Sequence, residues 1–169
     1  MPGSWRHLSS RFFGSLAGRD LDDSELALLG GVLSEPEFEI FMGQSALDRR
    51  HGVEAARFAL DAGAPDPVVR AAALHDVGKR HARLGILGRV AASVCIKLRL
   101  PVRGRFQTYR DHGPIGAAEL AAVDAPPIAV TYARFHHGAR PSGVDRDLWA
   151  LLDAADAASE RSQSVRVDR

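Results

Sequence analysis

Apolar residues dominate long stretches of the chain, and their spacing favours helices. Residues 26–29 and 71–74 are built only from alanine and leucine, which are strong helix formers. Clusters of β-branched residues that alternate with polar ones, as in a half-buried β-strand, are nearly absent. The pattern predicts an all-α fold, a single-domain helical bundle.

Capping and stop residues divide this pattern into eight expected helices. N-cap candidates at residues 22–24 precede a helix through residues 25–29, which Gly30 and Gly31 weaken at its far end. Ser34 and Glu37 stand at capping-box spacing before a second helix. Further helices are expected over residues 48–60, 68–77 (stopped by Gly78), 84–98, 114–123, 127–136 and 146–158, with a loop over the arginine-rich residues 101–110.

Composition limits the classes of protein that fit. With 169 residues, 46% hydrophobic and 25% charged, the chain suits one globular domain with a substantial core. Its net charge of +1 provides no basic field for nucleic acid, so no nucleic-acid partner is expected. The single cysteine, Cys95, cannot form an internal disulfide. No apolar run is long enough for a membrane span, and residues 1–7 lack the apolar core of a signal peptide, so we expect a cytoplasmic location.

Three segments are expected along the chain. Residues 1–20 form an amphipathic N-terminal arm, residues 21–158 the helical domain, and residues 159–169 a polar C-terminal tail that frays. The arm carries Trp5, Phe12, Phe13 and Leu16. These side chains either pack on the domain or form a contact with a partner, including a homodimer contact.

The strongest local signal is the sequence AAALHDVGK at residues 71–79. An apolar helix here ends in an imidazole (His75), a carboxylate (Asp76) and, one turn on, an ammonium group (Lys79). Burying His75 and Asp76 is costly without partners, and one divalent cation would serve both. Lys79 could reach a phosphate oxygen. A hydrogen-bonded His–Asp pair at a helix end is the simpler alternative, and the dipeptide alone does not separate the two.

Histidines recur at helix ends or inside helices along the rest of the chain. His51 falls in the first turn of its expected helix, His112 stands immediately before a helix, and the doublet His136–His137 closes the next one. His7 and His81 are left over. On the last expected helix Asp153 and Asp156 lie three residues apart and share a face, so either could reach a metal.

In this order, the histidines, the His-Asp pair and the distant aspartate resemble the signature of the HD-domain metal-dependent phosphohydrolases, which are helical bundles. The likeness covers roughly residues 45–158. HDxGK, an intermediate histidine and a His-His doublet resemble the subgroup that includes cyclic-dinucleotide phosphodiesterases. The chain departs from the HD-GYP branch, because residues 138–141 read GARP where Gly-Tyr-Pro would follow the doublet. A cyclic-di-GMP substrate is therefore in doubt.

The resemblance implies a set of roles. It implies one or two divalent metals per chain, drawn from Mn, Fe, Zn, Ni and Co, and an HD-type bundle around them. Asp76, as a bridging ligand, and Lys79 become the expected catalytic residues. Asp156 is preferred to Asp153, because the family's aspartate follows an alanine. The implied ligands are His51, His75, Asp76 and Asp156 for the first metal, and His112, His136 and His137 with Asp76 for the second.

The expected function is hydrolysis of a phosphate ester by metal-activated water. The substrate would be a small phosphorylated molecule such as a nucleotide or a cyclic dinucleotide. Arg50 and Arg105 are candidate substrate contacts, since a guanidinium pairs well with phosphate. Two alternatives stay open: a dinuclear-iron oxygenase, and a non-catalytic signalling module that binds a nucleotide or a metal.

Overall fold

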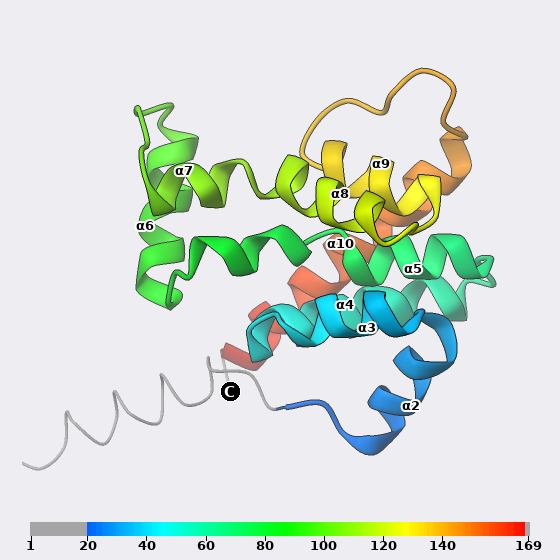
Figure 1. The fold of residues 1–169 in the computed structure, drawn as a ribbon. Helices are drawn as coiled ribbons and strands as arrows, with labels where there is room; N and C mark the ends of the chain where they lie inside the picture. Colours follow the sequence, from blue (N-terminus) through cyan, green and yellow to red (C-terminus); the bar gives the residue numbers. More distant parts are fainter. Residues whose placement is uncertain (1–19, 168–169) are drawn as a thin grey trace, which may run out of the picture.

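Nine α-helices and one short 3₁₀ helix, η1, build the described part of the chain, which contains no β-strand (Figure 1). The computed structural model describes the backbone of residues 20–167 and the side chains of residues 20–159. The predicted all-α bundle is confirmed. The elements are α2 (Asp23–Val32), α3 (Glu35–Met42), α4 (Ala46–Asp61), α5 (Asp66–Leu74), η1 (Val77–Ala82), α6 (Ile86–Lys97), α7 (Arg105–Arg110), α8 (His112–Ala122), α9 (Pro127–Phe135) and α10 (Arg146–Val167).

The first helices begin at the capping residues that the sequence predicted. The Asp22 carboxylate accepts from the Glu25 N–H at 3.0 Å, and the Glu25 carboxylate accepts from the Asp22 N–H at 2.9 Å. At the start of α3, the Glu37 carboxylate accepts from the Ser34 N–H at 2.8 Å. Each of these bonds satisfies a backbone N–H at the start of a helix, which has no partner within the helix itself.

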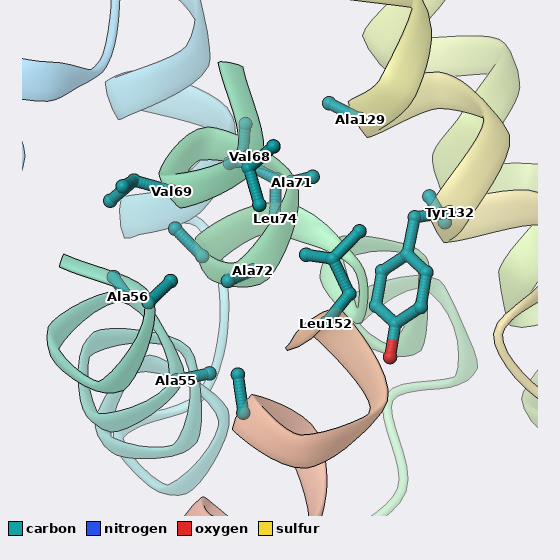
Figure 2. Close-up of a cluster of buried hydrophobic side chains, with 14 of the residues drawn as sticks. Ala55, Ala56, Val68, Val69, Ala71, Ala72, Leu74, Ala129, Tyr132 and Leu152 are labelled. Carbon is teal, nitrogen blue, oxygen red and sulfur yellow. The ribbon is translucent and has the colours of Figure 1, made fainter. Parts of the chain in front are cut away.

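The hydrophobic core lies where α4 and α5 pack on α9 and α10 (Figure 2). Alanines make up much of the contact between these helices, and their short side chains let the helix axes approach closely. Leu74, Tyr132 and Leu152, each at most 1% exposed, fill the space between them. The fully buried alanines of this region include Ala55, Ala56, Ala71 and Ala129.

Two glycines bring neighbouring elements within backbone contact beside the candidate site. A Cβ added at Gly52 on α4 would lie 2.6 Å from the Ala73 carbonyl oxygen on α5. A Cβ at Gly78 on η1 would lie 2.0 Å from the His112 carbonyl oxygen on α8. Both distances are below van der Waals contact, so any larger residue would force the helices apart. The glycines thus fix how closely the helix ends that carry His51, Asp76 and His112 can meet.

Several helix boundaries around the predicted site differ from expectation, those of α5 and α4 among them. Helix α5 ends at Leu74 rather than Val77, and the chain continues at once into η1. Gly78 is therefore no left-handed stop signal but a residue of η1 packed against α8. Helix α4 begins at Ala46, because the Ser45 hydroxyl accepts from the Asp48 N–H at 3.2 Å, which moves His51 into the second turn.

Two segments expected to be irregular are helical. The expected loop over residues 101–110 was wrong in its second half, where α7 forms after Gly104 turns the chain with a φ of 57°. The Arg105 Nε donates to the Ala82 carbonyl at 2.8 Å and fixes α7 against η1. Helix α10 runs to Val167, past the predicted end at Ala158, and Ser159 is buried.

Some expectations fall outside the described residues. The amphipathic arm predicted for residues 1–20 is described only at Asp20, so its packing and the homodimer contact stay predictions. The same holds for residues 168–169 of the predicted tail and for the side chains after Ser159. Across residues 20–167, no helix has both the length and the apolar character that crossing a membrane requires.

Replacing Gly78 tests the close approach of η1 and α8. Gly78→Ala should lower the free energy of unfolding by about 2–3 kcal/mol or more, because the atoms that a Cβ would meet are backbone atoms that cannot rotate away. Gly30→Ala, where a Cβ meets nothing within 4 Å inside α2, is the matched control and should stabilise by roughly 0.5–1 kcal/mol. Urea unfolding of both variants measures the difference; equal stabilities would contradict the packing described.

Candidate metal centre

Five elements supply the two groups of donor atoms at the candidate site, mostly by their ends. His75 caps the C-terminus of α5, and Asp76 follows it at the start of η1. His112 opens α8, and His136 caps the C-terminus of α9. The fifth element is α4, which supplies His51. Two groups of donor atoms result, each with all atoms within 4.8 Å of one another: His51, His75 and Asp76, and Asp76, His112, His136 and His137.

Asp76 belongs to both groups because its two carboxylate oxygens face opposite ways. Oδ2 lies 3.5 Å from the Nε2 atoms of both His51 and His75. Oδ1 lies 3.2 Å from the His112 Nε2 and 3.4 Å from the His136 Nε2. The residue is 3% exposed. A carboxylate in this position could bridge two cations, one on each side.

The structure distinguishes Asp156 from Asp153, the two aspartates between which the sequence could not decide. The Asp156 Oδ1 lies 3.0 Å from the His51 Nε2 and 3.4 Å from the His75 Nε2, which adds a second carboxylate to the first group. Asp153 instead accepts a hydrogen bond from the Tyr132 hydroxyl at 3.2 Å. Asp156 therefore lies at the cluster, and Asp153 lies beside it on a tyrosine that packs against the His75 and His136 rings.

Backbone carbonyls orient three of the imidazoles. The Nδ1 atom of each lies within hydrogen-bonding distance of the carbonyl three residues earlier: His75 at 2.9 Å from Ala72, His112 at 2.7 Å from Tyr109, and His136 at 3.0 Å from Ala133. A carbonyl can only accept, so Nδ1 carries the proton and Nε2 keeps a free lone pair. This is how proteins commonly fix the orientation and tautomer of metal-binding histidines.

The fourth imidazole is fixed by a residue that the sequence reasoning missed. The Ser159 Oγ lies 2.8 Å from the His51 Nδ1 and donates to the Asp156 carbonyl at 2.7 Å. Because the Ser159 hydroxyl proton is donated to the Asp156 carbonyl, the Ser159 oxygen must accept from the His51 Nδ1–H. The His51 Nε2 then keeps its lone pair, which faces the cluster. Ser159 stands three residues after Asp156 on the same face of α10. That spacing could have indicated Ser159 from the sequence, but residue 159 was assigned to a fraying C-terminal tail.

The electrostatics favour positive charge at this point. Burial acts to raise the pKa of Asp76, but Lys79 and His75 outweigh it and hold this pKa well below its usual range. The Lys79 ammonium is bonded to the same carboxylate. Burial lowers the pKa of His75, yet Asp76 and Asp156 outweigh that effect and raise it. Burial lowers the pKa of His136, which keeps this ring neutral as a metal ligand must be.

The donor set fits a divalent cation. Four imidazole lone pairs converge, with the Nε2 atoms of His51 and His75 3.2 Å apart and those of His112 and His136 3.4 Å apart. Among the described residues the buried Asp76 Oδ1 has no hydrogen-bond donor. Lone pairs and an unsatisfied carboxylate oxygen this close are costly unless a cation lies between them. Imidazole and carboxylate together suit Zn, Fe, Mn, Ni or Co.

The two arginines predicted to contact substrate have other partners in the structure, and their contact with substrate stays a prediction. The Arg50 guanidinium is buried against Glu25 of α2 and donates to the Asp20 carbonyl at 2.9 Å. Arg105 donates to the Ala82 carbonyl, as described above. Neither is among the residues that line the cleft beside the cluster. His81 also lies apart, 2.8 Å from Glu119, and His7 is outside the described residues.

A cleft of about 380 Å³ opens from the first group of ligands. Its inner end is lined by His51, Asp76 and Lys79, and its far wall is α6. The volume lies within the roughly 300–1,000 Å³ of typical small-molecule sites. The guanidinium of Arg89 on α6 pairs with both oxygens of Asp48 on α4 and so links the two walls of the cleft. Sequence reasoning placed no residue of α6 at the site.

Metal uptake tests the two groups of ligands separately. Equilibrium dialysis against manganese should give about two equivalents per chain. His136→Ala should give about one, because it removes a donor only from the second group, and Asp156→Asn should weaken the first. Asp153→Asn, on the same helix face but bonded to Tyr132, is the control and should keep both. A single equivalent in the wild type that His136→Ala leaves unchanged would contradict the second site.

Comparison with protein-family models, with curated proteins and with solved structures finds no match to this chain. A function for it therefore has to be argued from the cluster and the cleft themselves.

Proposed function

We propose that this protein is a phosphohydrolase that uses two divalent cations held by the His/Asp cluster to cleave a small phosphate ester. His51, His75 and Asp156 would hold one cation. His112, His136 and His137 would hold the other, and Asp76 would bridge the two. Phosphate esters are the substrates that such paired cations serve best, since the transferring phosphoryl group carries negative charge on several oxygens at once.

The observation that carries the proposal is the division of the Asp76 carboxylate between two sets of imidazoles. Oδ2 faces His51 and His75, and Oδ1 faces His112 and His136, at 3.2–3.5 Å in each case. A single structural ion would need only one of these sets. Two sets that share one buried carboxylate are the arrangement expected of a dinuclear site.

The bound cations, Lys79 and Tyr132 would then have different roles. When bound, the cations would lower the pKa of a coordinated water and withdraw charge from the phosphoryl oxygens. Lys79, beside Asp76 on the inner wall of the cleft, would bind a phosphate oxygen and orient the ester. Burial raises the pKa of the Tyr132 hydroxyl further above neutrality, so this group stays protonated and serves to position Asp153.

The two alternative functions share the same ligand set and differ in what they consume. An iron-loaded oxygenase would consume dioxygen without releasing phosphate. A binding module would take up metal and ligand and release nothing. Assays of phosphate release and oxygen consumption on manganese- and iron-loaded protein separate all three. Oxygen consumption without phosphate release would favour the oxygenase.

Lys79 is the residue whose loss should affect hydrolysis without removing metal. Lys79→Met should lower kcat/KM for p-nitrophenyl phosphate or its diester by about a hundredfold, because a positioned cationic donor to the phosphate is lost. Metal content should stay at the wild-type value. Arg103→Met, which removes an exposed positive charge on the segment before α7, is the control for net charge and should change kcat/KM little.

Asp76→Ala provides the stricter test of the same proposal. It should abolish hydrolysis together with metal binding on at least one side of the cluster. Full activity of Asp76→Ala on an ester that the wild-type protein cleaves would overturn the assignment of the site.

A further inference from the structure

Helix α6 stands at the edge of the bundle beside α7 (Figure 1). None of its apolar side chains belongs to the main core cluster. Of its twelve residues only Ala92 is buried. Leu87, Val90 and Val94 are 70%, 58% and 50% exposed. Large apolar side chains left in water on one helix need a function, since the fold gains little from them.

One flank of α6 forms the far wall of the cleft. Ile86, Val90 and Val94 line it at four-residue spacing, which places them on one face of the helix. Leu47 of α4 lines the opposite side. The inner end of the same cleft carries His51, Asp76 and Lys79. The apolar wall and the candidate metal centre thus line one cleft, so a ligand larger than phosphate at the centre would extend onto the wall.

Apart from Lys97, the charged groups along the cleft lie at its inner end or are already paired. Lys79 is bonded to Asp76, and Arg89 is paired with both oxygens of Asp48. Lys97, which has no ionic partner among residues 20–159, lies a full eleven residues from Ile86, or roughly 16 Å along the helix. Between these ends the wall offers mainly aliphatic surface, with Ser93 as its one hydroxyl from α6.

We infer that the ester cleaved here carries an apolar organic group, which lies against Val90 and Val94 while its phosphate lies at the metals and Lys79. This inference rests on the proposed function and narrows its substrate class. An alkyl or similar hydrocarbon group gains from burial on this wall, whereas a hydroxylated sugar would lose hydrogen bonds to water without replacing them.

Non-hydrolysable alkylphosphonates test the inference by binding alone. Calorimetry on manganese-loaded protein with methyl-, butyl-, hexyl- and octylphosphonate should give affinities that rise by about twofold for each methylene, since the chain is only partly enclosed. Octylphosphonate should therefore bind on the order of a hundredfold more tightly than methylphosphonate. Inorganic phosphate should compete with every member of the series.

Shape-preserving variants locate the effect on the wall. Val90→Thr combined with Val94→Thr should reduce the gain with chain length by about tenfold for octylphosphonate and leave methylphosphonate unchanged. The matched control is Leu87→Thr with Leu98→Thr, two exposed residues of the same region that do not line this cleft, and it should keep the full gain. Far-ultraviolet circular dichroism checks that both double variants remain folded.

The outcomes separate the inference from the function on which it rests. If no phosphonate binds the metal-loaded protein, the proposed function fails. If all bind with equal affinity, or the control variant loses the gain as well, the phosphate site stands and the apolar wall is refuted. Tighter binding of propane-1,3-bisphosphonate than of propylphosphonate, reversed by Lys97→Met, would also overturn the inference in favour of a doubly anionic ligand.

Discussion

The position of one carboxylate, that of Asp76, determines how the rest of this molecule is arranged. It is buried, ionised and close to imidazoles from four helices, so α5, α8 and α9 must end or begin beside it and the second turn of α4 must pass it. Gly52 and Gly78 allow that approach, as does Gly113, where a Cβ would lie 2.8 Å from the Ala133 carbonyl oxygen of α9. The alanine-rich contacts of the core extend the same close spacing through the bundle.

Such a cluster is expensive to bury, and its cost links metal binding to folding. The carbonyls of Ala72, Tyr109 and Ala133 hold the imidazoles with their lone pairs inward, which is unfavourable without a cation. A cation that binds the folded chain and not the unfolded one contributes its binding free energy to stability, about 4 kcal/mol at a thousandfold excess over Kd. The geometry that would hold a cation therefore also makes the stability of the fold depend on whether one is bound.

The helices and most of the site could be predicted from the sequence because they depend on local signals. Capping residues such as Asp22 and Ser34 act within one turn. Which histidines and aspartates would meet was implied by the resemblance to a known family. Their role as ligands stays a prediction. Asp156 was distinguished from Asp153 only by resemblance; the structure separates them because Tyr132, distant in sequence, bonds to Asp153.

What the sequence could not predict depends on tertiary partners. Arg50 looks like a phosphate contact beside His51, but the carboxylate that it meets is Glu25, far away in the chain. Helix α7 depends on the positive φ of Gly104 and on packing against η1. The sequence predicted the helix that became α6. It could not predict that this helix lies opposite α4, where its apolar flank forms a wall of the cleft.

Anomalous X-ray scattering from a crystal of the manganese-loaded protein would show whether Asp76 bridges two cations, as proposed. Data collected with anomalous signal from manganese should give two peaks, one on each side of the Asp76 carboxylate, about 3.5–4 Å apart. One peak would lie beside His51 and His75 and the other beside His112 and His136. A single peak, or peaks away from Asp76, would show that Asp76 does not bridge two cations.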